Sequence, residues 1–256
     1  MSDGVWVKVH PEDAGGGGLE GLGTWADVTT VTGASGNRYT YKDIDGFDWV
    51  AYEWTDDGSV TTTQGLVDLL LVGAGGERSA VPTASLGPGG RSGAGNAGGL
   101  VTGLWEVTEV ANDIIVGVAP AYGSGQPSTD TTFSGITIPA AGGGYAGPNN
   151  RGSSALGSVV GFGNGSPGFK SSITGIETEY GRGGYLGSSA NDNWTNNTVI
   201  PSEMPSTAGT FGWGGSVFPY DSASGGHGEP ATSGVFIIRI PAANALATIP
   251  GTWGDL

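Results

Sequence analysis

The stretch SGVFIIRIPAA, residues 233–243, decides the fold of this chain. It is typical of a strand of bulky apolar side chains, yet it follows about ninety residues in which such runs are nearly absent. A second apolar strand, GLVDLLLVGAGGE at residues 65–77, shows no alternation of apolar and polar positions, so both of its faces need cover. We expect the two strands to pair and close one domain. The alternative is that 233–243 is an edge strand that only happens to come last.

The composition favours an ordered β protein. Of the 256 residues, 52 are Gly and 14 are Pro, but 37% are hydrophobic and eight are Trp, which is not typical of disorder. Three-four spacing of apolar residues with helix caps is absent. The predicted fold class is all-β, with a β-sandwich-like core, long ordered glycine-rich loops and a small N-terminal β unit.

The chain is predicted to divide into three parts. Residues 1–60 are the N-terminal β unit, residues 61–242 form a glycine-rich β domain, and residues 243–256 are a C-terminal tail. Within the first part, TWADVTTVTG and NRYTYKDID are expected to form a hairpin around GASGN, residues 33–37. Within the second, LWEVTEV and NDIIVGVAPAYG indicate two strands joined by a short turn.

Glycine dominates residues 142–234, with single aromatic residues between the glycines. Because glycine permits close approach of backbones, we interpret this tract as ordered loops packed backbone against backbone and anchored by those aromatics. Ordering a backbone costs about 1–2 kcal/mol per residue, and glycine has no side chain to offset it. We therefore expect neighbouring subunits to supply contacts and the chain to form a homo-oligomer.

Charge and the absence of certain motifs exclude several classes of function. The net charge of −15, with nine scattered Lys and Arg, argues against nucleic-acid binding. There is no Cys, and the longest apolar run is too short to span a bilayer, so no membrane insertion is expected. No positively charged segment followed by an apolar one begins the chain, so we expect a protein that is soluble as made, in a cytoplasm.

No residue pattern predicts catalysis, a metal or a cofactor. The two histidines, His10 and His227, lie far apart in the sequence, and no cysteine accompanies them. Paired carboxylates typical of glycosidases occur in DIDGFD, TDDGS and ETEYG, where Glu177 and Glu179 would share one face of a strand. The Asp pairs sit in turns, where Asp commonly bonds its own backbone. We expect no catalytic, metal or cofactor-binding residues.

The order of motifs in the second half resembles a known family. In sequence, LLLVGAGG, LWEVTEV, DIIVGVAPAYGSG, TTFSGITIPAAGGG, SSITGIETEYGRGGYLG and SGVFIIRIP follow one another across residues 65–241. This order is similar to that of the glycine-rich domain of bacteriophage minor tail proteins and tail fibres, especially of siphophages that infect Gram-positive hosts. Several glycines of the family pattern are replaced here, and residues 188–224 contain an Asn/Thr-rich insertion.

The resemblance implies a non-enzymatic virion component, assembled in the cytoplasm of a host bacterium. It suggests a minor tail protein at the tail tip or fibre, with a trimer favoured, that contacts other phage virion proteins and a host cell-surface glycan. The alternatives are a capsid-surface decoration or fibre protein and, from another class, a tail-associated polysaccharide-cleaving enzyme.

Aromatic residues supply the candidates for recognition and docking. Exposed Tyr and Trp favour binding patches and stack on sugar rings. The recognition candidates are Tyr145, Tyr185, Trp194, Trp213 and Tyr220. The candidates for docking to other virion proteins are Trp6, Trp25, Trp49, Trp54 and Trp253.

Overall fold

A computed structural model describes residues 24–76, 95–108, 111–119, 127–138, 168–184, 211–214 and 230–256. These residues contain no α-helix, which confirms the predicted all-β class. The strands are β1 (Val28–Gly33), β2 (Gly36–Lys42), β3 (Asp48–Trp54), β4 (Gly58–Thr62), β5 (Gly65–Val72), β6 (Leu100–Val107), β7 (Ala111–Ile115), β8 (Thr131–Phe133), β9 (Ile136–Ile138), β10 (Phe169–Ser171), β11 (Thr178–Tyr180), β12 (Val235–Pro241) and β13 (Gly254–Asp255). A short 3-10 helix, Ala242–Asn244, follows β12.

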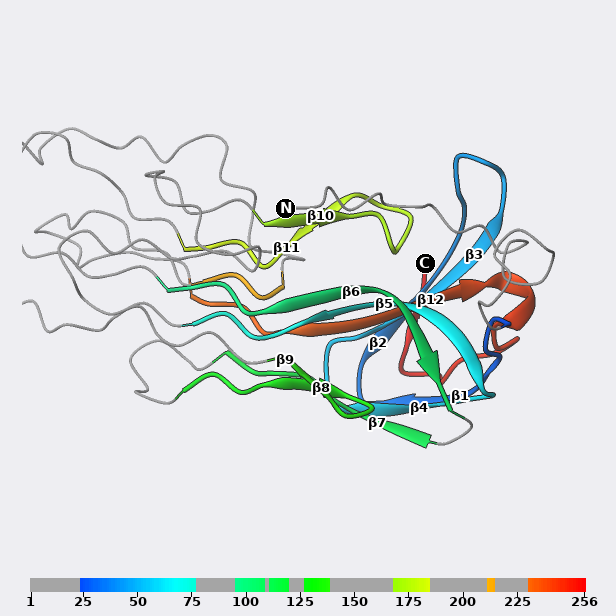
Figure 1. The fold of residues 1–256 in the computed structure, drawn as a ribbon, viewed down its shortest axis with the longest axis horizontal. Helices are drawn as coiled ribbons and strands as arrows, with labels where there is room; N and C mark the ends of the chain where they lie inside the picture. Colours follow the sequence, from blue (N-terminus) through cyan, green and yellow to red (C-terminus); the bar gives the residue numbers. More distant parts are fainter. Residues whose placement is uncertain are drawn as a thin grey trace, which may run out of the picture.

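The strands form a sandwich with a small third layer. A six-stranded sheet has the order β13-β2-β3-β12-β5-β6, and a five-stranded sheet has the order β1-β4-β7-β8-β9. The hairpin of β10 and β11 forms a separate two-stranded sheet. In Figure 1 the six-stranded sheet lies between the five-stranded sheet and this hairpin. Both faces of the six-stranded sheet are therefore covered.

The closing strand β12 occupies the middle of the six-stranded sheet. It pairs antiparallel with β5 on one side, where Val235 lies opposite Val72, and with β3 on the other, where Phe236 lies opposite Trp54. The predicted pairing of residues 233–243 with 65–77 is confirmed, and the edge-strand alternative is wrong. Because β12 has a partner on each side and a layer on each face, it needs an apolar side chain at nearly every position.

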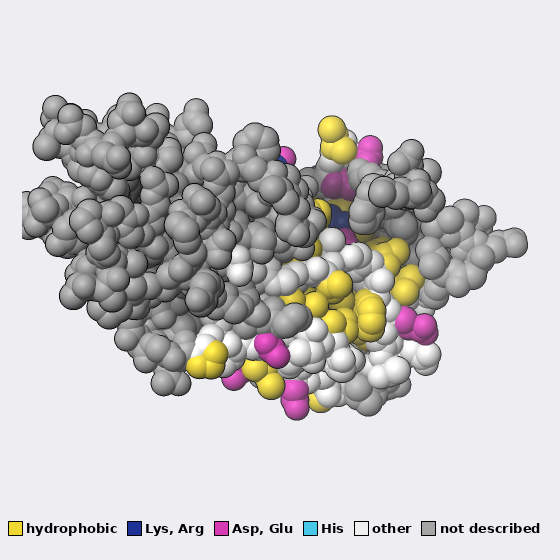
Figure 2. Space-filling view, turned by 60° about the vertical axis from the view of Figure 1, so that its left-hand side comes forward, with side chains coloured by type: hydrophobic (Ala, Val, Ile, Leu, Met, Phe, Trp, Pro, Cys, Tyr) yellow, Lys and Arg dark blue, Asp and Glu magenta, His cyan; other side chains and the backbone are white. Residues whose placement is uncertain are grey.

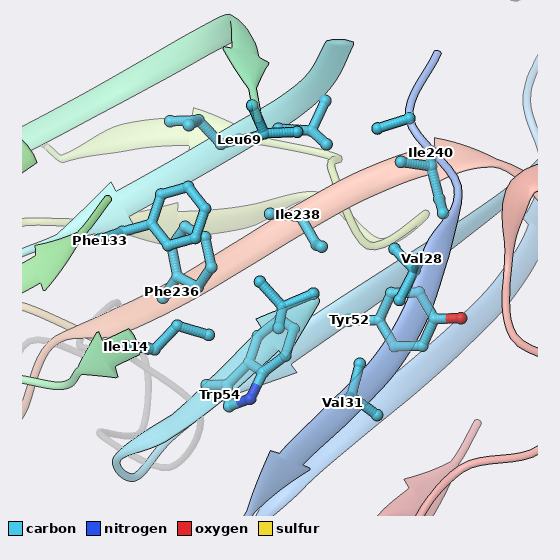
Figure 3. Close-up of a cluster of buried hydrophobic side chains, with 14 of the residues drawn as sticks. Val28, Val31, Tyr52, Trp54, Leu69, Ile114, Phe133, Phe236, Ile238 and Ile240 are labelled. Carbon is cyan, nitrogen blue, oxygen red and sulfur yellow. The ribbon is translucent and has the colours of Figure 1, made fainter. Parts of the chain in front are cut away.

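Two apolar clusters hold the layers together. The larger one fills the space between the two sheets and includes Trp54, Phe236, Ile238, Ile114 and Phe133 (Figure 3). Phe133 of the five-stranded sheet stacks on Phe236 with ring centroids 4.3 Å apart. The smaller cluster lies under the β10–β11 hairpin; its buried members are Ala51, Leu70, Val72, Ile173, Tyr180, Val235 and Ile237. Successive residues of β12 alternate between the two clusters, as the pleat of a strand requires.

Five glycine-containing segments pack together beyond the strand ends, and we call them the glycine bundle: residues 73–76, 95–99, 181–184, 211–214 and 231–234. The segment 211–214 hydrogen-bonds to three others, whereas a strand in a sheet has at most two neighbours. The N–H of Gly212 donates to Ser233, that of Gly98 donates to Gly212, and that of Gly214 donates to Arg182. A Cβ on Gly75 would overlap the carbonyl of Trp213. For the described bundle segments of the tract 142–234, namely 181–184, 211–214 and 231–234, packing of backbone against backbone is as predicted.

The two strands predicted in LWEVTEV and NDIIVGVAPAYG are present as β6 and β7, and they belong to different sheets. Two other expectations about local organisation were wrong. Residues 24–33 and 37–45 form no hairpin, because β1 pairs with β4 and β2 pairs with β3, in different sheets. The predicted domain boundary at residue 60 falls inside β4, and β3 pairs directly with β12. The described part of residues 1–60 is thus built into the sandwich and shares its core.

The C-terminal residues are also part of the fold. The backbone of β13 pairs in parallel with β2, and the Trp253 ring packs edge-on against Trp54 with centroids 5.0 Å apart. None of the described residues belongs to a helix long and apolar enough to cross a membrane.

Candidate functional site

A half-open pocket lies between the β10–β11 hairpin and one end of strands β2 and β3. Its volume is about 240 Å³. The lining residues are Asn37, Tyr39, Glu53, Thr55, Thr174, Ile176, Thr178, Tyr180 and Phe211. They combine one carboxyl group, several hydroxyl groups, an amide and three aromatic rings. A concave site that mixes apolar walls with a few convergent polar groups is the usual form of a small-ligand site.

Glu53 is the one acidic residue of this pocket lining. Its side chain projects from β3 opposite Asn37 of β2, and only 5% of the residue is exposed. Its Oε1 accepts hydrogen bonds from Asn37 Nδ2 at 2.7 Å and from the Tyr39 hydroxyl at 3.1 Å. Burial raises the pKa of Glu53, because removal from water disfavours the charged form more than the two neutral donors favour it.

The tyrosines of the pocket respond to the same carboxyl group. Burial raises the pKa of Tyr39, and the nearby charge of Glu53 raises it further. Burial and Glu53 likewise raise the pKa of Tyr180. Both phenols therefore stay protonated at neutral pH. The Tyr39 hydroxyl can keep donating to Glu53 throughout that range.

The β10–β11 hairpin is held over the sheet by specific contacts. The Tyr41 hydroxyl of β2 donates to the Ile173 carbonyl at 2.8 Å. Gly175, with a positive φ of 84°, approaches the Tyr41 ring so closely that an added Cβ would lie 2.6 Å from it. Tyr180 stacks on Phe211 with centroids 6.3 Å apart. These contacts fix the outer wall of the pocket relative to Glu53.

A partly buried ion pair lies on the same face of the six-stranded sheet. Asp68 of β5 and Arg239 of β12 are directly opposite in register, and an Arg239 nitrogen donates to the Asp68 carboxylate. The Arg239 guanidinium also lies 4.6 Å from the centre of the Trp49 ring, and its Nη1 donates to the Tyr41 hydroxyl at 3.4 Å. Burial raises the pKa of Asp68 despite the neighbouring cation. The ion pair links β5 to β12, so we assign it a structural role.

The carboxylates that the sequence singled out have structural partners. Asp43 accepts backbone N–H bonds from Asp45 and Phe47 within its own turn. Asp57 accepts the Val116 N–H at 2.8 Å, which ties one turn to another. Within the described ranges, no group of three or more His, Cys, Asp and Glu side chains has the arrangement of a metal site.

Glu177 and Glu179 contact different partners around the hairpin. Glu177 pairs with Lys170 at 2.8 Å on the outside. Glu179 accepts the Gly168 N–H at 2.6 Å and pairs with Arg182 at 3.4 Å. Neither carboxylate lines the pocket that contains Glu53.

The structure corrects the role expected for the described tryptophans. Trp25, Trp49, Trp54 and Trp253 are all buried. Each contributes to the larger apolar cluster, so none offers an exposed ring for docking to another protein. Trp6 lies outside the described residues.

Only one of the recognition candidates lies within the described residues. Trp213 is buried in the glycine bundle, with the Arg182 guanidinium 5.5 Å from the centre of its ring. Its role is that of an anchor for the bundle. Tyr145, Tyr185, Trp194 and Tyr220 lie outside the described residues, as do His10 and His227.

The pocket residues were missed by sequence reasoning. One signal was available: in DWVAYEW, residues 48–54, Glu53 interrupts a run of buried aromatic and aliphatic side chains. The positions of Thr174, Tyr180 and Phe211 had no such signal, because they reach the pocket only through the tertiary fold.

Acidic side chains outnumber basic ones among the described residues. Figure 2 shows acidic side chains scattered over the described part of one face, with few Lys or Arg side chains among them. This distribution agrees with 24 acidic and nine basic residues in the whole chain.

No family model, curated protein or solved structure matches the chain.

Proposed function

We propose that the chain is a structural component of a bacteriophage virion, a minor tail protein at the tail tip or fibre that contributes to host-surface attachment. The observation that carries the proposal is the glycine bundle joined to a sandwich in which β5 and β12, the first and last strands of the region that carries the resemblance, are adjacent. The motif order of the sequence resembles that of tail glycine-rich domains, and β5 and β12 pair as the resemblance implies.

The arrangement supports a role in holding and presenting chain segments. Trp213, Arg182 and the lateral backbone bonds fix the glycine bundle to the end of the sandwich. Such a base gives the intervening segments defined starting points, and binding surfaces are commonly built on loops held by a rigid scaffold.

The pocket favours binding over hydrolysis. Glycosidases use a pair of carboxyl groups about 5–9.5 Å apart across the scissile bond. Glu53 is the one acidic side chain among the described pocket-lining residues, and the remaining lining is neutral. No observation therefore favours the polysaccharide-cleaving alternative.

Immunogold labelling of virions with antibodies against this chain tests the proposal. Gold at the tail tip or along a fibre is the expected result. Gold on the capsid would replace the proposal with the surface-decoration alternative. Absence of the chain from purified particles, checked by mass spectrometry, would overturn the virion assignment altogether.

A further inference from the structure

We propose that the pocket around Glu53 binds one sugar ring of a neutral glycan, with the Glu53 carboxylate accepting a hydrogen bond from a ring hydroxyl. The idea that this site attaches the chain to a host glycan rests on the function proposed above. The idea that the pocket binds a sugar rests only on the residues that line it.

One carboxylate oxygen of Glu53 is available as a hydrogen-bond acceptor among the described residues. Both of its hydrogen bonds from described residues, from Asn37 and Tyr39, end on Oε1. Oε2 has no hydrogen-bond partner among the described residues, and it is not among the fully buried unpaired atoms of this part of the chain. Because Glu53 lines the pocket and its Oε1 already accepts two hydrogen bonds, Oε2 is the oxygen left to accept a donor from a ligand. Hydrogen bonds to a charged acceptor are the stronger kind.

The walls of the pocket combine polar and apolar side chains. Thr55, Thr174 and Thr178 belong to the lining. Thr55 Oγ1 bonds Ser35 Oγ and Thr178 Oγ1 donates to the Ile176 carbonyl, and a hydroxyl with one such bond can still accept another. The half-buried rings of Tyr39 and Phe211 add apolar surface to the same lining. A pyranose ring presents hydroxyls at its edge and an apolar C–H surface on its face, so it can use both kinds of wall.

The volume of the pocket and the charge of Glu53 limit the class of ligand further. A volume of about 240 Å³ lies below the usual 300–1,000 Å³ of pockets for drug-sized ligands, so a single ring fits better than an extended chain. An anionic ligand would meet the Glu53 carboxyl group in the pocket lining. A quaternary ammonium group has no donor for Oε2. A neutral polyhydroxylated ring is the class that suits all of these groups.

The site is open at a rim that includes an exposed apolar side chain. Ile176, in the turn between β10 and β11, is 64% exposed and lines the pocket. Its side chain adds apolar surface at the rim, which a bound ring can contact. The rest of a longer glycan can leave the pocket past this turn.

The experiment uses the full chain and calorimetric titration with methyl glycosides of neutral hexoses and N-acetylhexosamines. Choline and glucosamine serve as cationic probes. Three variants are compared: Glu53→Gln in the pocket, Ile176→Ser at the rim, and Glu106→Gln as the matched control. Glu106 is exposed on β6 and is not among the pocket-lining residues.

The expected result is that at least one neutral glycoside binds. Glu53→Gln should weaken this binding by about 10- to 100-fold, because a hydrogen bond to a charged group contributes roughly 1.5–3 kcal/mol. Ile176→Ser should weaken binding less, and Glu106→Gln should leave it unchanged. Chemical-shift changes on ligand addition should centre on the lining residues.

Three outcomes overturn the inference. They are no binding by any neutral glycoside, binding that Glu53→Gln leaves unchanged, and binding by the cationic probes alone. Failure of the proposed function is a separate observation, because it is read from the location of the chain in virions. Sugar binding with no chain in the virion would retain the site and reject the tail role.

Discussion

Replacing Thr131 by valine tests how the two sheets are joined. Thr131 lies in β8 of the five-stranded sheet and is fully buried. Its Oγ1 donates to the Val72 carbonyl at 2.8 Å and accepts the Gly117 N–H at 2.9 Å. Val72 belongs to β5 of the six-stranded sheet, so a single hydroxyl bridges the two layers inside the core.

The loss of stability expected for Thr131→Val follows from the two backbone groups that lose the Thr131 hydroxyl as their hydrogen-bond partner, the Val72 carbonyl and the Gly117 N–H. Valine has nearly the shape of threonine, so the apolar packing is retained while the hydroxyl is lost. Each buried polar group left unpaired costs about 1–3 kcal/mol, and two groups are affected here. We expect the free energy of unfolding to fall by about 2–4 kcal/mol, because the Val72 carbonyl lies in a ladder strand that offers it other donors. For a chain of this length, such a loss lowers the Tm by roughly 4–16 °C.

Thermal and urea denaturation, followed by tryptophan fluorescence, measure the effect. Thr137→Val is the matched control, because Thr137 is exposed on β9 and the same chemical change there removes no buried bond. Thr131→Ser keeps the hydroxyl and should recover most of the stability. If Thr131→Val and Thr137→Val are equally stable, the bridge contributes nothing and the reasoning is refuted.

Four further predictions concern the bundle, the ion pair, the pocket and assembly. Gly75→Ala should disrupt the glycine bundle, because the new Cβ meets the Trp213 backbone; limited proteolysis should then cleave the variant faster than the parent, and an unchanged digestion pattern would contradict this. Arg239→Met should lower the free energy of unfolding by about 1–3 kcal/mol in urea titrations, because it leaves the partly buried Asp68 carboxylate without its cation. Adding Asp68→Leu should restore most of this loss. Glu53→Gln should raise the free energy of unfolding at neutral pH but not below about pH 4, because the parent pays for a buried charge only once Glu53 ionises. The gap in free energy of unfolding between variant and parent should grow as pH rises toward and through the raised pKa of Glu53. A gap that is independent of pH would exclude the burial penalty. Light scattering should give about three times the 25.5 kDa chain mass, and a stable 25.5 kDa particle would reject the trimer.

The pairing of β5 with β12 could be predicted because the pattern itself requires it. A continuous apolar run needs cover on both faces, and the chain contains few such runs. The order of β1 and β2 could not be read in the same way. Their short separation suggested a hairpin, but Gly33 takes a φ of 151° and the chain passes from one sheet to the other there. The turn residues between β1 and β2 are compatible both with a hairpin and with a crossing between sheets. Which of the two forms depends on the positions of β4 and β3, with which β1 and β2 pair.

The tryptophans show a second limit of reasoning from sequence. Spacing identifies aromatic residues but not the layer that covers them. Trp54 has an Nε1 that donates to the Thr32 carbonyl at 2.8 Å, and its ring contacts both Phe236 and Trp253. These partners are separated from it by up to 199 residues, so the burial of Trp54 is a property of the sandwich as a whole.

Three charged residues interrupt the apolar strands of the six-stranded sheet, and their partners differ. Asp68 and Arg239 lie opposite each other, so a pairing of the two strands in register predicts their ion pair. Glu53 is flanked by Tyr52 and Trp54 and has only neutral donors from described residues, Asn37 and Tyr39. Burying a carboxylate without a cation costs stability, as the raised pKa of Glu53 reflects. A glutamine would fill the same space without that cost. Glu53 therefore contributes nothing to the stability of the sandwich that glutamine would not contribute, but it gives the pocket a charged hydrogen-bond acceptor. Asp68 and Arg239 neutralise each other and join two strands, so Glu53 differs from them in serving the pocket rather than the fold.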